Sequence, residues 1–190
     1  NEYWNERAGK KFFNEIYSWS VDNQIKAVNF YTFIELYTCF HLQELGVTPK
    51  EILKSRAAMI KDLNIPYPFA SDTILSDGKK IWFEFKDSIV KADGSRQTDF
   101  VEFIRDFANK IDFNSNKIAE KFWPAGKQSD IVINPHNQFG QPILNGTNIN
   151  AEVIFSMYES GEPTDAISIL YDITPKQVND AISFYKKSAA

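Results

Sequence analysis

The sequence predicts a mainly α-helical protein with small β hairpins, an α+β fold that contains two modules of the helix-turn-helix type. Apolar residues recur at intervals of three and four in several segments, which is the period of a helix with one buried face. Capping residues stand directly before these segments, and an Asp-Gly pair separates two short apolar runs. We expect the N-terminal module to be winged and the C-terminal module to be tri-helical.

The composition is that of a folded globular protein. The 190 residues are 43% hydrophobic and 15% aromatic, enough for the cores of two small domains. A single cysteine, Cys39, excludes an intrachain disulfide and a cysteine-based zinc site, which is typical of a reducing compartment. No run approaches the roughly 18 apolar residues that span a bilayer, so we expect a cytoplasmic protein without a membrane partner. Residues 2–4 resemble the end of a helix, which indicates that the natural N-terminus precedes Asn1.

The first half of the chain predicts an antiparallel helix pair followed by a hairpin. Residues 29–45 are apolar on almost all sides and predict a buried helix. The residues that recur at intervals of three and four, and form its expected stripe, are Phe30, Phe33, Ile34, Tyr37, Phe40 and His41. Thr48 and Pro49 begin the next helix, and Glu51 completes a capping box. The turn 76–79 then joins the apolar runs 74–75 and 80–83 into a hairpin. Residues 100–107 have helical spacing, and we expect a short helix there.

The C-terminal part is the most regular. The turn at Asn145 and Gly146 predicts a small hairpin or an extended arm. Three helices follow, which begin at Asn150, Pro163 and Thr174. Their expected inner faces are Val153, Ile154, Met157 and Tyr158; Ala166, Ile167, Leu170 and Tyr171; and Val178, Ala181, Ile182 and Tyr185. The last two helices are joined by about three residues, the spacing of a helix-turn-helix. We therefore divide the chain into 1–70, a truncated winged-helix module; 71–130, a linking region with the hairpin and a helix; and 131–190, the C-terminal domain.

Two polar patches are candidates for DNA binding. The net charge of −4 excludes a protein whose whole surface binds nucleic acid, but a local patch is compatible with it. The last helix carries groove-reading residue types opposite or beside Val178, namely Lys176, Gln177, Asn179 and Ser183. Asp180 on the same side repels phosphate, so an ordinary solvated face is the alternative. A second patch combines aromatic residues near the N-terminus with Lys10, Lys11 and Lys26. The alternative is that these lysines are only a soluble surface over an aromatic core.

Residues suited to catalysis are few. His41 lies in the buried helical run, where we expect a core histidine bonded to a backbone group, and Cys39, two positions away, points to another face. We expect His136 to be a polar loop residue. The acids around the predicted hairpin match no metal motif by their spacing: Asp72, Asp77, Glu84 and Asp87. We therefore predict a protein that is not an enzyme and that holds neither cofactor nor metal.

Three C-terminal segments carry a family resemblance: 139–149, 161–166 and 174–182. They resemble domain-of-unknown-function family 433, whose pattern is an arm Gly-x-Pro-x-Ile-x-Gly-Thr-Arg, a helix, a Gly-Glu start and a helix ending in Ala-x-x-Tyr. Members of that family resemble VapB-type antitoxins. The arginine of the arm is replaced here by Asn148, which removes a cation that would grip DNA phosphate.

The upstream region resembles longer members of the same group, in which a MerR-like winged helix-turn-helix precedes the C-terminal unit. The matching pieces are 29–30, 45–47, 66–70, 73–79, 111–113 and 123–124. The resemblance implies an antitoxin that neutralises a PIN-like nuclease encoded beside it and represses its own promoter DNA as a homodimer. The alternative is a protein-interaction module that never contacts DNA.

Overall fold

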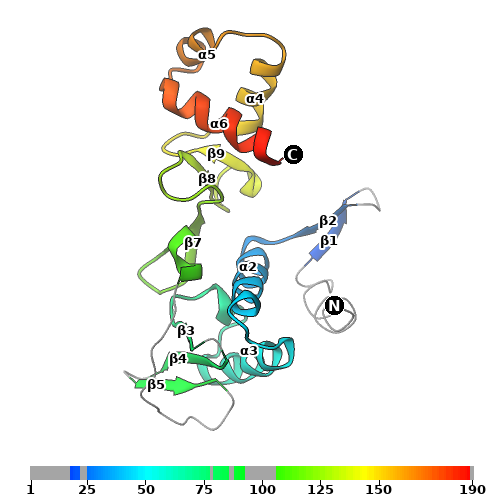
Figure 1. Cartoon of the computed structure of the whole chain (residues 1–190), viewed down its shortest axis with the longest axis vertical. Helices are drawn as coiled ribbons and strands as arrows, with labels where there is room; N and C mark the ends of the chain where they lie inside the picture. Colours follow the sequence, from blue (N-terminus) through cyan, green and yellow to red (C-terminus); the bar gives the residue numbers. More distant parts are fainter. Residues whose placement is uncertain (1–17, 22–24, 78, 86–87, 93–105, 189–190) are drawn as a thin grey trace. The chain divides into compact units, whose positions relative to one another are not determined.

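The computed structural model describes residues 18–21, 25–77, 79–85, 88–92 and 106–188. It divides the chain into two compact units, Asn1–Ala108 with Phe113–Ala119 and Asn109–Asp112 with Glu120–Ala190. Helices and small antiparallel sheets alternate along the chain (Figure 1), which confirms the predicted α+β class. Among the described residues, no helix is both long and apolar enough to cross a membrane.

The first unit begins with a hairpin and a helix pair. Strands β1 (Ser18–Val21) and β2 (Ile25–Val28) pair antiparallel. Helix α2 (Phe30–Glu44) starts at Asn29, whose side chain accepts a 2.8 Å hydrogen bond from the backbone N–H of Thr32. Helix α3 (Pro49–Leu63) starts at Thr48 as predicted, and the short helix η2 (Pro68–Ala70) follows. A MerR-like arrangement of these elements stays a prediction.

A small sheet follows the helix pair in sequence and packs against α3. Strands β3 (Ile74–Ser76), β4 (Ile81–Phe85) and β5 (Ser88–Lys91) are antiparallel in that order. The carboxylate of Asp77 accepts hydrogen bonds from the backbone N–H groups of Lys79 and Lys80, at 2.8 and 2.6 Å, and so closes the predicted turn. The helix predicted at 100–107 lies largely outside the described residues, which resume with the 3₁₀ helix η3 (Asp106–Lys110).

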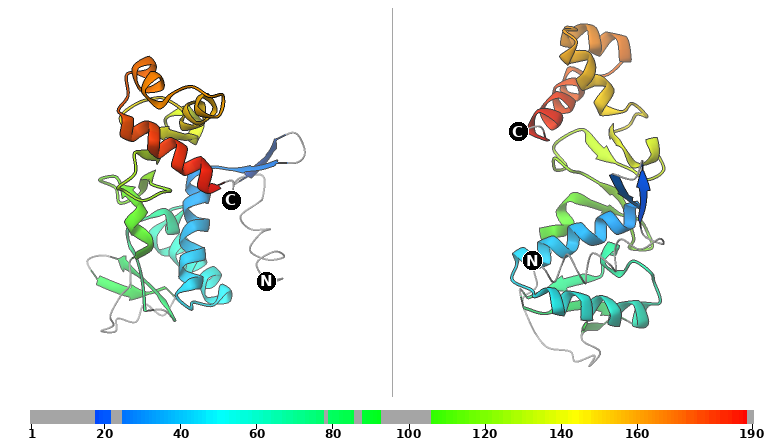
Figure 2. Two further views of the ribbon diagram at one scale, coloured as in Figure 1. Left: turned by 45° about the horizontal axis from the view of Figure 1, so that its top comes forward. Right: turned by 90° about the vertical axis from the view of Figure 1, so that its right-hand side faces the viewer.

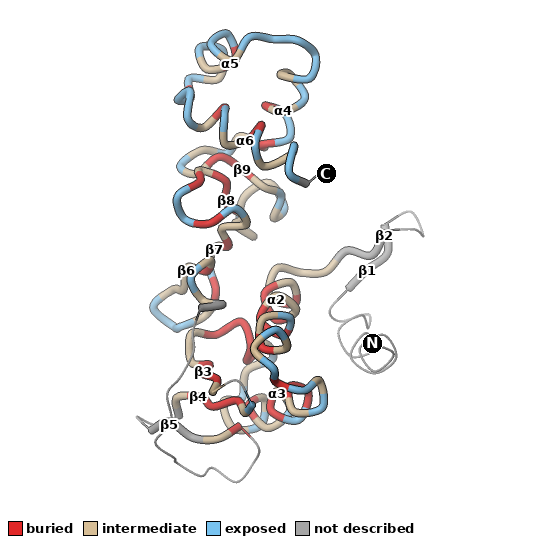
Figure 3. The backbone as a smooth tube through the Cα atoms, in the orientation of Figure 1, coloured by how far each residue is buried: buried red, intermediate tan, exposed pale blue. Residues whose placement is uncertain are grey.

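The buried side of α2 differs from the predicted one. Phe40 is 62% exposed, and the other aromatic residues of the expected stripe are only half-buried. Ile34 is buried as predicted, and the other buried residues of α2, a helix coloured by burial in Figure 3, are Thr32, Glu35, Thr38, Cys39 and Leu42. Polar bonds to η2 explain the change: Glu35 accepts from the backbone N–H of Phe69 at 3.2 Å, and the Thr38 hydroxyl donates to the Phe69 carbonyl at 3.0 Å. These bonds turn a partly polar stripe towards the interior.

The second unit joins a sheet to a group of helices. Its strands are β6 (Ile111–Phe113), β7 (Ala119–Phe122), β8 (Ile131–Ile133) and β9 (Pro142–Leu144), neighbours in that order. The described chain ends with α4 (Ala151–Glu159), α5 (Thr164–Tyr171) and α6 (Pro175–Ser188), which confirms the predicted helices. Helix α4 packs on β9 and α6 packs on β8 (Figure 2). The core comprises Ile131, Leu144, Ala151, Ile154, Ile167, Ile173, Val178, Ala181 and Ile182.

Candidate functional site

The first turn of α6 holds Lys176, one of the residues predicted to bind DNA. Its ammonium group lies 2.8 Å from the carboxylate of Asp130 and 2.7 Å from that of Asp180. Hydrogen bonds to these two carboxylates raise the pKa of Lys176, which stays protonated. The lysine is exposed, but its charge is already matched by two acids of its own unit. A phosphate would have to compete with both.

Gln177 occupies the third position of α6 and completes a capping box. Its backbone N–H donates to the Thr174 hydroxyl at 3.2 Å, and its side-chain oxygen accepts from the backbone N–H of Thr174 at 2.9 Å. The amide nitrogen of the same side chain donates to the Asn145 carbonyl at 3.2 Å. Both ends of the side chain are therefore used within the fold. The Thr-x-x-Gln spacing was the sequence signal for this role.

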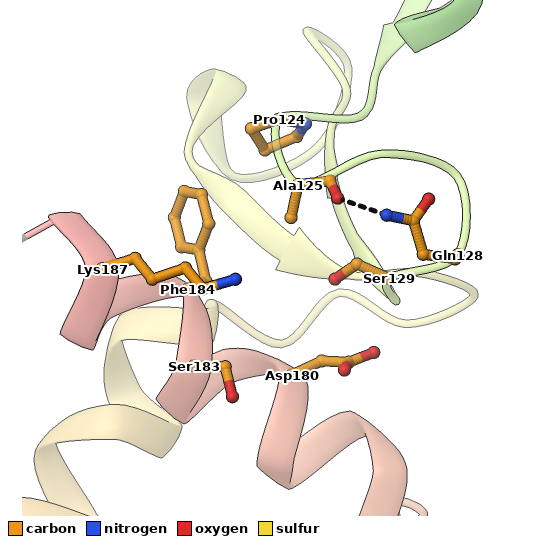
Figure 4. A pocket seen from close by; sticks show the side chains of 8 residues that line it. All are labelled: Pro124, Ala125, Gln128, Ser129, Asp180, Ser183, Phe184 and Lys187. Atoms are coloured by element: carbon orange, nitrogen blue, oxygen red, sulfur yellow. Dashed lines mark hydrogen bonds between the residues drawn. The ribbon is translucent and has the colours of Figure 1, made fainter.

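The other predicted residues of α6, Asn179 and Ser183, are exposed. Ser183 lines an open pocket of about 470 Å³ between α6 and the loop 124–129 (Figure 4). The carboxylate of Asp180 accepts a 2.8 Å hydrogen bond from the backbone N–H of Asp130 and ties the end of this loop to the helix. A recognition helix must be clear enough to enter a groove about 12 Å wide. The loop 124–129 lies beside α6 at this open pocket.

The N-terminal candidates lie mostly beyond what the structure describes. Lys10 and Lys11 fall outside the described residues. The backbone of Lys26 lies on β2 opposite Ser20, and its side chain is not among those described. DNA binding by this patch stays a prediction.

The histidines and Cys39 form no reaction centre. His41 is half-buried rather than a core residue, and its Nδ1 lies 2.9 Å from the carboxylate of Glu44, which corrects the expected bond to the backbone. Cys39 is buried, and burial raises the pKa of its thiol well above the usual range. His136 is an exposed loop residue, as predicted. Among the described residues, no group of three or more His, Cys, Asp or Glu side chains is placed to hold a metal ion.

Helix α5 turns large apolar side chains towards solvent. Ile169 is 82% exposed and Leu170 is 67% exposed, and Ala166 and Val153 are exposed as well. The prediction that Val153, Ala166 and Leu170 face the core is therefore wrong. The left-handed conformation of Asp172, with φ of 52°, reverses the chain after α5 and brings Ile173 into the core. Ile167 and Ile173 are both buried in this core, and Leu170 remains outside it.

The surface around α5 is acidic. Residues 150–175 contain no Lys, Arg or His, and their five carboxylates are Glu152, Glu159, Glu162, Asp165 and Asp172. Glu152, Val153 and Met157 of α4 line a shallow groove of about 440 Å³ together with Glu162 of the loop that follows this helix. Negative charge of this density repels nucleic-acid phosphate. Apolar side chains exposed within a charged surface are typical of contacts between proteins.

Comparison with known proteins gives a consistent picture. Residues 131–185 match the model of a family described as "Protein of unknown function (DUF433)", which confirms the resemblance in that segment. The chain is 24% identical over 161 residues to the "Putative antitoxin VapB45" of Mycobacterium tuberculosis, a match that covers 78% of this chain and 67% of that protein. It is also 36% identical over 58 residues to "Uncharacterized protein Rv2308" of the same organism, covering 30% of this chain and 24% of that one.

A solved structure shares the fold. The crystal structure of Rv2018 from Mycobacterium tuberculosis matches with a TM-score of 0.61 and 14% sequence identity. The match covers 92% of this chain and 89% of that chain. The two proteins thus share a fold.

Proposed function

We propose that this protein is the antitoxin of a type II toxin–antitoxin pair and that it neutralises a PIN-like nuclease encoded beside it. The similarity to a protein named as an antitoxin, over 78% of the chain, supports this function. The observation that carries the proposal is the exposed apolar side of α5 in a stretch without cations. Such a surface is suited to holding another protein rather than to performing a reaction.

Neutralisation requires only binding, and no residue of this chain is given a catalytic role. The experiment is to express the neighbouring nuclease gene alone and together with this chain, and to follow growth. We expect the nuclease alone to arrest growth and the pair to grow normally. The two proteins should also purify as a complex whose nuclease activity is suppressed. Arrest that persists when the chain is present at equal amounts contradicts the proposal.

A second function, repression of its own promoter as a homodimer, is favoured by the pair α5 and α6. These helices are joined by residues 172–174, the spacing of a helix-turn-helix, and Asn179 and Ser183 are exposed on the second of them. We propose that these two residues contact base edges, with Lys176 and Gln177 held in place beside them.

Measuring affinity for the upstream DNA at two salt concentrations tests this second function. A repressor shows a steep loss of affinity with salt and a preference for its own promoter. Asn179→Ala with Ser183→Ala should then weaken specific binding at least about tenfold, since a good base contact contributes about 1–3 kcal/mol. The N-terminal patch is tested in the same way by a triple alanine variant of Lys10, Lys11 and Lys26, whose affinity for the upstream DNA is compared with that of the wild type. A chain that shows no specific shift is a protein-interaction module only.

A further inference from the structure

We infer that the outward side of α5 is the docking surface for a partner protein whose own contact surface is apolar and edged with lysine or arginine. The inference rests on the proposed function, because the partner is taken to be the nuclease. We call this surface the α5 face. It consists of Glu162, Asp165, Ala166, Ile169, Leu170 and Asp172.

The apolar part of the α5 face is one continuous side of the helix. At about 100° per residue, Ala166, Ile169 and Leu170 fall within a sector of about 100°, and Asp165 lies at its edge. Ile167, on the opposite side, is buried in the core of the unit. The helix is therefore apolar on both sides, and only one side is needed for folding. Ile169 and Leu170 gain most from removal from water, which makes them the expected anchors of an interface.

The charge of the α5 face selects the partner. Lys176 forms its two ion pairs with Asp130 and Asp180, and neither of these acids belongs to the α5 face. This lysine therefore does not neutralise the carboxylates of the α5 face. Two copies of the chain that met through this face would bring like charges together, which disfavours a second copy. Nucleic acid is disfavoured for the same reason. A nuclease must carry cations to hold phosphate, and these cations match the carboxylates beside the apolar residues.

The apolar contact is tested with the double variant Ile169→Gln, Leu170→Gln. Glutamine keeps the helix propensity of the segment, and circular dichroism checks that the fold is retained. The probe is the purified nuclease encoded beside this chain, and the measurement is the dissociation constant by calorimetry. We expect the constant to rise about 30-fold or more. The matched control is Phe40→Gln in the first unit, an exposed aromatic residue whose replacement should change the constant less than about twofold.

The charge contact is tested with Glu162→Gln, Asp165→Asn. This variant should weaken binding several-fold at low salt and should flatten the dependence of affinity on salt, because surface charge pairs are screened. A parallel measurement follows the mass of the chain alone by sedimentation as its concentration rises. We expect this mass to be the same for the wild type and for the Ile169→Gln, Leu170→Gln variant.

Three outcomes overturn the inference. Unchanged nuclease binding by the Ile169→Gln, Leu170→Gln variant places the docking surface elsewhere and leaves the proposed function intact. Self-association of the chain that the same variant abolishes, with nuclease binding retained, shows that a second copy covers the face. A wild-type chain that does not bind the nuclease overturns the proposed function and the inference together.

Discussion

At the scale of single residues, the buried carboxylate of Glu35 is the main polar feature of the first core. Its side chain is fully buried, and Arg56 reaches it with Nε at 3.0 Å and Nη2 at 2.6 Å from the same oxygen. Burial raises the pKa of Glu35, and the charge and hydrogen bonds of Arg56 oppose that rise. The pair fixes α2 against α3, since the two residues come from these helices.

We expect Arg56→Met to destabilise the protein by about 3–5 kcal/mol, because it leaves a buried carboxylate without its partner. The pKa of Glu35 then rises further. A carboxyl group with a raised pKa in the folded state favours folding at low pH, and this contribution is lost as the pH rises above about 4.5 towards the folded value. Urea denaturation should therefore find the variant more stable at pH 5 than at pH 8. Glu35→Gln, Arg56→Met is the control and should lose that pH dependence; equal stability of the single variant at both pH values contradicts the argument.

Gln177 gives a second prediction at this scale. Gln177→Ala removes the reciprocal half of the capping box and the bond to the Asn145 carbonyl. We expect a loss of about 0.5–2 kcal/mol in the stability of the second unit, measured by hydrogen exchange of the α6 amides. Gln177→Glu keeps the acceptor for the Thr174 N–H and should retain most of the stability. If the alanine variant is as stable as the wild type, the bonds of Gln177 do not stabilise the fold, and DNA binding is the role left for this side chain.

At the scale of elements, helix starts were predictable and helix faces were not. Asn29, Thr48, Asn150 and Thr174 all begin helices in the structure, because a capping side chain acts on backbone groups only two or three residues away. The hairpin turn at Asp77 was predictable for the same reason, since its bonds are local. Short-range geometry is fully encoded in the residues that form it.

The faces of α2 and α5 depend on distant partners. Helical spacing shows which residues share a side, but it does not show which side meets the rest of the protein. For α2, the buried side is set by the bonds of Glu35 to Arg56 and to Phe69 of η2, which lie more than 20 residues further along the chain than Glu35. For α5 it follows the chain reversal at Asp172. The candidate docking surface was missed because its apolar residues fit a core pattern equally well.

The turn η4 (Gln138–Gly140) supplies a prediction for an element. Phe139 has φ of 54° and its side chain is 102% exposed, so an aromatic residue sits in a left-handed conformation without packing. That conformation costs an L-residue about 1–2 kcal/mol, and glycine adopts it freely. We expect Phe139→Gly to stabilise the protein by about 0.5–1 kcal/mol in urea denaturation, after allowance for the greater freedom of the unfolded chain. Phe139→Ala is the control and should bring no gain. A loss of stability with glycine would show that the ring supports the fold.

At the scale of the whole molecule, charge is unevenly distributed. From residue 131 onwards the sequence has three lysines and no arginine against six carboxylates, a net charge of −3 of the total −4. The second unit thus carries most of the acidity together with the exposed apolar helix. This combination favours a cationic protein partner over DNA for that unit.

Each unit has a hydrophobic core made only of its own residues. We therefore expect damage to one core to remain local. Met59→Ala, at a fully buried position of the first core, should cost about 2–5 kcal/mol and raise amide exchange in α2, α3 and β4. Exchange in α4, α5 and α6 should stay at the wild-type rate. Ile154→Ala in the second core should give the reverse pattern. Faster exchange throughout the chain in either variant would mean that the two cores unfold as one cooperative unit, and the α5 face would then depend on the stability of both.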